Sequence, residues 1–339
     1  MVFYRDRQLT QFASSISLFA ITIGLVVSQS ATHKSLAQTS KNLGNGEGAS
    51  TVTALFTAIK GFTFTYSPVG SGAGLKAFFA KKPSPGAPSP INFADSDDPV
   101  AGTETVTDGS GYVQVPVVGV GITLAYNATG LTIPAGGIKL SSASYCGILN
   151  GSITNWSDKS ISTDNGGKLI ALNVPIKVVR RADSSGSTFI LSSHLNTVCK
   201  TWNRGVGTTV NWPSTFLSAT GGGKLADTVA SIKGGFGYVD NATRVSKSLP
   251  AALLRNKAGN YIAPSPAAIT AAIKDGTVVK YGTNKNLTRI DKLTNPSSAS
   301  SYPISGATYL LYYSNETGFQ DFIKAANALA ASLGYGSLP

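Results

Sequence analysis

The segment between Val178 and Leu195 combines a cation, several hydroxyl groups and the expected start of a helix. A β-branched stretch ends at Arg181, the polar turn Ser184-Ser185-Gly186-Ser187 follows, and an amphipathic run comes next. The first turn of a helix presents unpaired N–H groups and the positive end of the helix dipole, which favour bound anions. The planar guanidinium would add paired donors for a tetrahedral oxyanion. An ordinary strand–turn–helix with a serine N-cap and a surface arginine fits the same pattern equally well.

Two other turns rich in serine and glycine are expected where a strand leads into a helix. One lies around Ser50, and the other is the turn Gly70-Ser71-Gly72 before the helical run 75–80. Together with the turn at Ser185, they would bring three helix N-termini to one cleft and enclose an anion with few full charges. The turn at 70–72 is weak evidence by itself, because many such turns bind nothing.

A carboxylate beside such a site restricts the kind of anion that can bind. Asp97 lies in the acidic turn 95–98, and an ionised aspartate only accepts hydrogen bonds. It would repel sulfate, which carries no proton at neutral pH, and attract inorganic phosphate, which keeps at least one. Asp183, two residues after Arg181, could orient the guanidinium through a salt bridge. The competing interpretation of residues 95–98 is an acidic turn exposed to solvent.

Residues 1–37 have the pattern of a secretory signal peptide. Arg5 and Arg7 precede the apolar stretch 16–27, and small residues lead to a cleavage position after Ala37. The apolar stretch is shorter than the ~20 residues that a membrane-spanning helix needs. Because no cysteine lies near the cleavage position, no lipid anchor is expected. We therefore expect an exported protein, periplasmic or secreted.

Charge and composition exclude several classes of function. The net charge is +12, but Lys and Arg are scattered, so a small anion is a better partner than a nucleic acid. The two cysteines, Cys146 and Cys199, would pair in an oxidising compartment or remain as buried thiols. No Cys/His cluster is available for a zinc or transition-metal site, and no cofactor is expected. His194 lies in a polar stretch and is interpreted as a surface residue, not a catalytic base.

Short β-branched strands alternate with helices, which predicts an α/β fold with mostly parallel sheets. A chain of 339 residues exceeds the usual limit of a single core and favours two lobes. The glycines at 221–223 do not form a phosphate loop, because Leu225 follows the lysine, and they are interpreted as a flexible turn. The other predicted elements are a strand at 61–67, a strand at 113–126 that crosses between lobes, a helix at 267–274, a buried strand at 309–313 and a last helix at 319–333.

Five stretches of the chain resemble the periplasmic phosphate-binding proteins of bacterial ABC importers, most closely their DING-type branch. They are VGSGAGLKAFF at 69–79, FADSDDP at 93–99, CGILNGSITNW at 146–156, GFGYV at 235–239 and YPISG at 302–306. The likeness extends from about Ala49 to Leu338.

This resemblance implies a two-lobed type II periplasmic-binding-protein fold, a Venus flytrap with phosphate in the cleft between its lobes. Residues 45–116 and 250–339 would form lobe 1, and residues 117–249 would form lobe 2. The resemblance also supports a disulfide between Cys146 and Cys199. The phosphate ligands that it implies are Ser50, Thr51, Ser71, Asp97, Arg181, Ser185, Gly186 and Ser187, with Gly70 and Asp183 behind them.

We therefore expect a monomeric, non-enzymatic protein that binds phosphate with high affinity by closing around it. It would deliver phosphate to the membrane permease of a phosphate ABC importer. Arsenate has the same shape and protonation as phosphate and stays open as a ligand. Two alternatives belong to other classes: a secreted phosphatase or hydrolase that uses the same pocket, and an extracellular adhesion or matrix protein that retains the fold.

Overall fold

The computed structural model describes residues 40–283 and 285–339, so the predicted signal peptide at 1–37 lies outside the described residues. Strands and helices alternate along this part of the chain, as the sequence predicts. The strands are β1 (Lys41–Gly48), β2 (Phe62–Ser67), β3 (Ile91–Ser96), β4 (Tyr112–Tyr126), β5 (Lys139–Leu140), β6 (Lys177–Arg181), β7 (Leu217–Ala219), β8 (Gly235–Asp240), β9 (Leu253–Arg255), β10 (Tyr261–Ile262), β11 (Thr277–Tyr281), β12 (Leu287–Asp291) and β13 (Ser305–Tyr313).

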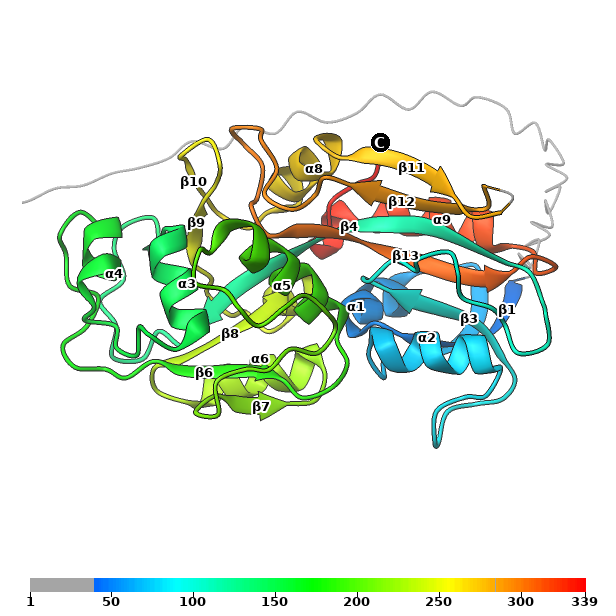
Figure 1. Ribbon diagram of the computed structural model, residues 1–339, viewed down its shortest axis with the longest axis horizontal. Coiled ribbons are helices and arrows are strands. Elements are labelled where there is room, and N and C mark those ends of the chain that lie inside the picture. Colours follow the sequence, from blue (N-terminus) through cyan, green and yellow to red (C-terminus); the bar gives the residue numbers. More distant parts are fainter. Residues whose placement is uncertain (1–39, 284) are drawn as a thin grey trace, which may run out of the picture. The chain divides into compact units, whose positions relative to one another are not determined.

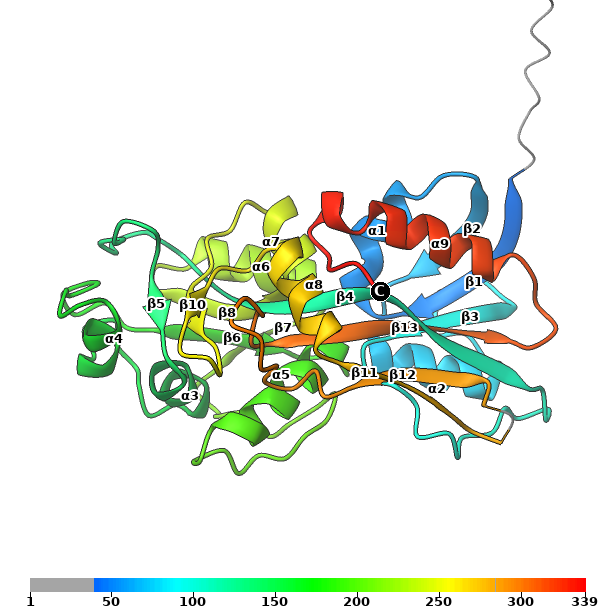
Figure 2. The same ribbon diagram turned by 90° about the horizontal axis from the view of Figure 1, so that it is seen from above.

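The helices lie against these strands, as Figures 1 and 2 show. They are α1 (Thr53–Ala58), α2 (Ser71–Ala80), α3 (Ser142–Asn150), α4 (Lys159–Asp164), α5 (Gly186–Val198), α6 (Gly222–Ser231), α7 (Asn241–Ser246), α8 (Pro266–Lys274) and α9 (Phe319–Leu329). Two 3-10 turns, η1 (Ser50–Val52) and η2 (Ala331–Leu333), complete the set. Within the described ranges, no helix has both the length and the apolar character that a bilayer crossing requires.

A mixed sheet connects most of the strands, in the order β2-β1-β3-β13-β4-β8-β6-β7. Parallel pairs at both ends of this order, β2-β1-β3 and β8-β6-β7, flank the antiparallel strands β13 and β4. Residues 112–121 of β4 pair with β13, and residues 122–126 pair with β8. The long strand predicted at 113–126 is thus one strand that belongs to both parts of the sheet, with a register shift beside Pro116.

A second, three-stranded sheet is formed by β10, β9 and β5. It joins residues 253–262 to residues 139–140, which lie far away in the sequence. The lobe boundaries at 116/117 and 249/250 stay a prediction.

The residues at the helix ends explain why the helices begin and end where they do. Ser265 caps α8 by accepting a hydrogen bond from the Ala268 N–H group, and Pro266 occupies the first turn. The last helix ends earlier than predicted, because the chain tightens into η2 before it stops at Gly334. Gly334 has a φ of 97°, a conformation that glycine adopts without strain.

Aromatic side chains hold α1 and α9 against the sheet. The Phe56 ring of α1 contacts Tyr66, Phe93 and Phe322 edge-on, with centroids 4.8–6.4 Å apart. Each such pair contributes roughly 0.5–1.5 kcal/mol beyond the burial of apolar area. Trp156 is fully buried in the same apolar cluster. These contacts fix the position of the turn at Ser50, which joins β1 to α1.

A disulfide links Cys146 of α3 to Cys199, the residue that ends α5. Their Cα atoms lie 5.7 Å apart, and the bridge closes a loop of 53 residues in sequence separation. The pairing expected from the resemblance is confirmed. Because α5 begins at the turn after Arg181, the bridge anchors the far end of a helix whose first turn faces the predicted site.

His194 is buried, so its interpretation as a surface residue is wrong. It lies on the same face of α5 as the buried residues Ile190 and Leu191, which are four and three positions earlier. The polar neighbours at 192–193 hid this periodicity in the sequence. The Nε2 atom of His194 lies 2.9 Å from the Tyr145 hydroxyl group, and burial lowers the pKa of His194 to about 3.

This buried imidazole should contribute to acid unfolding. The pKa of His194 lies below its ordinary value of 6.5, so its contribution to stability is full above pH 6.5 and is lost as pH falls toward 3. Replacing His194→Gln should remove about 2.5 kcal/mol of the decrease in unfolding free energy between pH 7 and 4.5. Urea unfolding of both proteins at the two pH values measures this difference. Equal decreases would contradict a neutral, buried His194.

Candidate functional site

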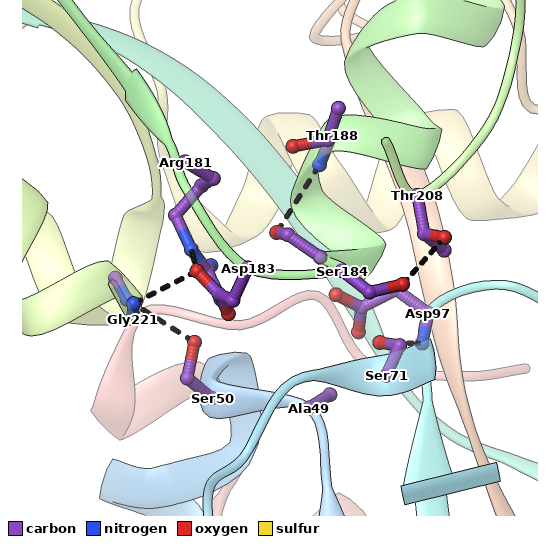
Figure 3. A network of polar contacts seen from close by, with 12 residues as sticks. Ala49, Ser50, Ser71, Asp97, Arg181, Asp183, Ser184, Thr188, Thr208 and Gly221 are labelled. Atoms are coloured by element: carbon purple, nitrogen blue, oxygen red, sulfur yellow. Dashed lines mark hydrogen bonds and ion pairs between the residues drawn. The ribbon is translucent and has the colours of Figure 1, made fainter. Parts of the chain in front are cut away.

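The predicted site residues lie at the carboxyl ends of several strands. β1 leads to the turn at Ser50, β2 to the start of α2 at Ser71, and β3 to Asp97. β6 ends at Arg181, and β8 ends at Asp240. Since α/β sheets commonly bind ligands at the carboxyl ends of their strands, this placement is typical of a binding site. Figure 3 shows how the side chains of Ser50, Ser71, Asp97 and Arg181 lie relative to one another.

The first turn supplies two hydroxyl groups that contact residues far away in the sequence. The Oγ atom of Ser50 accepts a hydrogen bond of 3.3 Å from the Gly222 N–H group, at the start of α6. The buried hydroxyl group of Thr51 donates to Oδ1 of Asp97 over 2.8 Å. The turn thus approaches two elements from different parts of the chain.

The start of α2 packs directly against the turn that precedes α5. Ser71 is fully buried, and its Oγ atom accepts a hydrogen bond of 3.3 Å from the Asp97 N–H group. The Gly72 N–H group donates to the Ser184 carbonyl oxygen over 3.2 Å. A Cβ atom at Gly70 would lie 2.6 Å from that oxygen, so this close approach requires glycine.

Arg181 is buried and held by a carboxylate from its own turn. Its Nε atom donates to Oδ1 of Asp183 over 2.7 Å, and Nη2 forms an ion pair with Oδ2. Oδ1 also accepts a 3.0 Å hydrogen bond from the Gly221 N–H group. Burial alone would raise the pKa of Asp183, but the bonds from Arg181 and Gly221 lower it. The guanidinium therefore has the paired contact that the sequence suggested for Asp183.

Tyr238 of β8 connects Arg181 to α5. Its hydroxyl oxygen accepts a hydrogen bond of 3.0 Å from the Arg181 N–H group and lies 2.7 Å from the Thr188 hydroxyl group. The ring centroid of Trp212 lies 5.6 Å from the centroid of Tyr238. The backbone at Arg181 is thus fixed to the first turn of α5 and to an aromatic pair.

The first turn of α5 faces Asp97. Ser185 is the N-cap, since its Oγ atom accepts from the Thr188 N–H group over 3.4 Å. A Cβ atom at Gly186 would lie 2.4 Å from Oγ of Ser71 and 2.6 Å from Oδ2 of Asp97. Glycine is therefore required where the α5 backbone meets these groups. Ser187 follows in the same turn and is buried.

Asp97 is a buried carboxyl group with one oxygen available. Its Oδ1 atom is bonded by Thr51, whereas Oδ2 is buried and has no hydrogen-bond partner among the described residues. Burial raises the pKa of Asp97 to about 7, although the hydrogen bond from Thr51, the nearby hydroxyl group of Thr308 and the charge of Arg181 oppose the rise. The acidic turn is therefore not exposed to solvent at this position. Its carboxyl group can change charge near neutral pH.

Two further groups at the site were missed by the sequence interpretation. The N–H groups of Gly221 and Gly222, assigned to a flexible turn, contact Asp183 and Ser50. Asp240 caps α7 through the Thr243 N–H group, and burial raises its pKa to about 6. The glycine-rich start of α6 was a signal for the first group. Nothing in the local sequence distinguishes Asp240 from any other helix cap.

Hydrogen bonds and close approaches thus connect the predicted site residues with one another. Ser187 is the exception, because only its position next to Gly186 places it at the site. A cavity of about 580 Å³ opens beside this cluster, lined in part by Ser50, Thr53 and Gly221–Gly223. Helices α2, α5 and α6 start at the cluster, so their N-terminal dipoles act on the same small volume. This arrangement suits an oxyanion that is held by hydroxyl and N–H donors around one guanidinium.

Several known proteins are similar to this chain in sequence and in fold. The family model of the PBP superfamily domain matches residues 27–328. The phosphate-binding protein PstS of Pasteurella multocida is 32% identical over 73% of this chain and 67% of that protein. This chain belongs to the periplasmic phosphate-binding proteins. PstS of Xylella fastidiosa is 29% identical over 83% of this chain and 75% of that protein.

A solved structure of the periplasmic phosphate-binding protein PfluDING, with bound phosphate, has the same fold. The TM-score is 0.66 at 24% identity, over 87% of this chain and 90% of that chain. The predicted type II periplasmic-binding-protein fold, α/β with mixed, mostly parallel sheets, is therefore confirmed. One relative carries an enzyme's name: alkaline phosphatase L of Pseudomonas aeruginosa is 28% identical over 59% of this chain and 58% of that protein.

The buried charge of Asp240 should lower the stability of the ligand-free protein at neutral pH. Because its pKa is raised from 3.8 to about 6, the contribution to stability is full below pH 3.8 and is lost as pH rises through 6. Asp240→Asn keeps a capping oxygen and should raise the unfolding free energy at pH 8 by up to about 3 kcal/mol, but not at pH 4.

Urea unfolding at pH 4 and pH 8 measures this effect. Asp158→Asn is the matched control, because Asp158 caps α4 through the Ser160 N–H group and is less buried. This control measures the effect of changing a capping aspartate to asparagine at a position where the side chain is less buried. A gain for Asp240→Asn that is equal at pH 4 and pH 8 would rule out an unfavourable buried charge.

Proposed function

We propose that this protein binds inorganic phosphate at the cluster around Arg181 and Asp97 and delivers it to the membrane permease of a phosphate ABC importer. Membership of the periplasmic phosphate-binding proteins supports this role. The single observation that carries it is the Oδ2 atom of Asp97, which is buried against the first turn of α5 and has no hydrogen-bond partner within residues 40–283 and 285–339. We further propose that the protein acts as an exported monomer.

Asp97 provides the selectivity in this proposal. Phosphate keeps at least one proton near neutral pH and can donate it to Oδ2 of ionised Asp97, whereas sulfate has no proton to donate. The repulsion between Asp97 and an unprotonated anion would cost more in a buried site than in water, because the local dielectric constant is lower. Arsenate shares the shape and protonation of phosphate, so the same contact would accept it.

The remaining ligands in the proposal are donors fixed before the anion arrives. Arg181 is oriented by Asp183, and the hydroxyl groups of Ser71 and Ser185 are fully buried. The N–H groups of Gly186 and Ser187 belong to the first turn of α5. Charge-assisted hydrogen bonds of this kind contribute about 1.5–3 kcal/mol each, so several of them would give high affinity. Ser50 and Thr51 complete the set from the η1 turn.

Release of phosphate would require the two proposed lobes, residues 45–116 with 250–339 and residues 117–249, to separate. The hydrogen bonds Gly72–Ser184 and Gly222–Ser50 join these two groups of residues. They are the contacts that opening would break, and ligand binding would favour the state in which they are formed. The closing motion would thus be driven by the anion that bridges both lobes.

Replacing Arg181→Ala should weaken phosphate binding by about 100-fold or more, because the buried cation is lost while Asp183 keeps its negative charge. Ser185→Ala should cost only about tenfold, since it removes one neutral hydroxyl group. Titration calorimetry with inorganic phosphate measures both variants. Arg180→Ala is the matched control, because the side chains of adjacent strand residues point to opposite faces. Unchanged affinity in the Arg181 variant would remove Arg181 from the site.

Asp97→Asn should reduce the preference for phosphate over sulfate by about 10-fold to 100-fold. The amide group can donate to an oxygen that has no proton, so sulfate affinity should rise while phosphate affinity falls. Competition titrations with the two anions measure the ratio. Asp98→Asn, at the neighbouring half-buried position, should leave it unchanged. An unaltered ratio in the Asp97 variant would mean that Asp97 does not contact the proton of the ligand.

The name of one relative, alkaline phosphatase L, keeps a phosphatase as the second candidate. Release of p-nitrophenol from p-nitrophenyl phosphate by the purified wild type, and its loss in Ser185→Ala, would favour that candidate. Thermal melts with a panel of oxyanions separate binding from the adhesion or matrix alternative, because a ligand of the native state raises the melting temperature with its concentration. A melting temperature that no anion changes would favour an adhesion or matrix role.

A further inference from the structure

We propose that Asp95 sets the pH dependence of phosphate binding: it keeps a proton while Asp97 engages the anion, and loss of that proton weakens binding. This inference rests on the proposed function of the site. It assigns a role to a second carboxyl group, which does not contact the anion and acts through its neighbour Asp97.

Asp95 and Asp97 form a buried pair of carboxyl groups. Asp95 lies in β3, Asp97 is the first residue after this strand, and the charge of Asp97 acts on the carboxyl group of Asp95. Thr308 of β13 donates a hydrogen bond to Oδ1 of Asp95, and Thr51 donates to Oδ1 of Asp97. In each group the second oxygen, Oδ2, is buried and has no hydrogen-bond partner in the described part of the chain.

The titratable groups on the neighbouring elements do not compensate the charge of this pair. Burial raises the pKa values of Tyr66 and Tyr335, and the nearby charges of Asp95 and Asp97 raise both further; Asp240 is the largest charge effect on Tyr335. Both hydroxyl groups donate to backbone carbonyl oxygens instead of to the carboxyl groups. Glu47 on β1 is also buried near Tyr66 and is bonded by a backbone N–H group.

In the described part of the chain, the guanidinium whose charge acts on these carboxyl groups is that of Arg181. Arg181 acts on Asp97 and Asp240, but Asp183 already holds it in a two-point ion pair. If Asp95, Asp97, Asp183 and Asp240 were all ionised, four negative charges would surround one positive charge in a buried site. Adding an anionic ligand would make this balance worse, so at least one carboxyl group must remain neutral.

Asp95 is the carboxyl group best placed to remain neutral. Asp97 has the oxygen that faces Gly186 and the proposed ligand, whereas Asp95 is bonded to Thr308 and lies behind it. Burial and the neighbouring charge of Asp97 both raise the pKa of Asp95, more than the Thr308 hydroxyl group lowers it. A bound anion adds another negative charge nearby, so binding would raise this pKa further and take up a proton.

The test compares phosphate affinity of the wild type and Asp95→Asn between pH 6 and 9, by titration calorimetry with inorganic phosphate. Phosphate's own titration affects both proteins equally and therefore cancels in the ratio of their dissociation constants. The ratio of wild type to variant should be constant at low pH and then rise by up to about tenfold per pH unit as Asp95 ionises. Repeating the titration in two buffers with different heats of ionisation should show less proton uptake in the variant.

Two other variants keep the inference open to contradiction. Asp98→Asn removes a carboxyl group that interacts with Glu104, and its affinity ratio to the wild type should not change between pH 7 and 9. Thr308→Val removes the hydrogen bond that lowers the pKa of Asp95, so the loss of affinity should begin at higher pH; this variant replaces Asp95→Asn if the latter does not fold.

A ratio for Asp95→Asn that stays constant from pH 6 to 9, with phosphate binding intact in the wild type, would overturn the role of Asp95 alone. Failure of the wild type to bind phosphate at any of these pH values would overturn the proposed function, and this inference with it.

Discussion

The balance of buried charge around Arg181 is the constraint on which the rest of the site depends. A guanidinium removed from water must be paired, and Asp183 pairs with it through two contacts within the same turn. Burial raises the pKa values of the carboxyl groups of Asp97 and Asp240, and the charge of Arg181, which is already paired with Asp183, only partly opposes this rise. Selectivity for a protonated anion and sensitivity to pH therefore have one electrostatic origin in our proposal.

The architecture makes this concentration of charge possible. Strands from both parallel groups of the sheet end at the cluster, and the chain continues from each end into a helix or a polar turn. Backbone N–H groups at the helix starts offset negative charge without adding another ionisable side chain. Glycine at positions 70, 72 and 186 lets these starts approach within contact distance, since a Cβ atom would overlap a neighbour at each of them. The backbone N–H groups thus stabilise negative charge at a place where additional cationic side chains would otherwise be needed.

The sequence predicted the elements better than it predicted which side chains they bury. The alternation of strands with helices, the serine cap of α8 and the turns at Ser71 and Ser185 follow from local patterns, and the structure contains them. Burial of His194 and Asp240 depends on which elements pack against α5 and β8, and the residues beside them carry no sign of it. Asp95 illustrates the same limit. Because Asp95 belongs to an acidic stretch, the sequence predicts a carboxylate exposed to solvent. Its hydrogen-bond partner, Thr308, lies more than 200 positions later in the chain.

The contact between the rings of Trp212 and Tyr238 places a natural fluorophore, the Trp212 indole, close to the residues of the site. The tyrosine hydroxyl group touches the backbone of Arg181 and the side chain of Thr188, and its ring lies beside the indole. Any rearrangement of the β6 end or of the first turn of α5 is therefore passed to an indole through a single intervening ring. Intrinsic fluorescence should report changes at the proposed anion-binding cluster in real time, without a dye and without an engineered cysteine near the native disulfide.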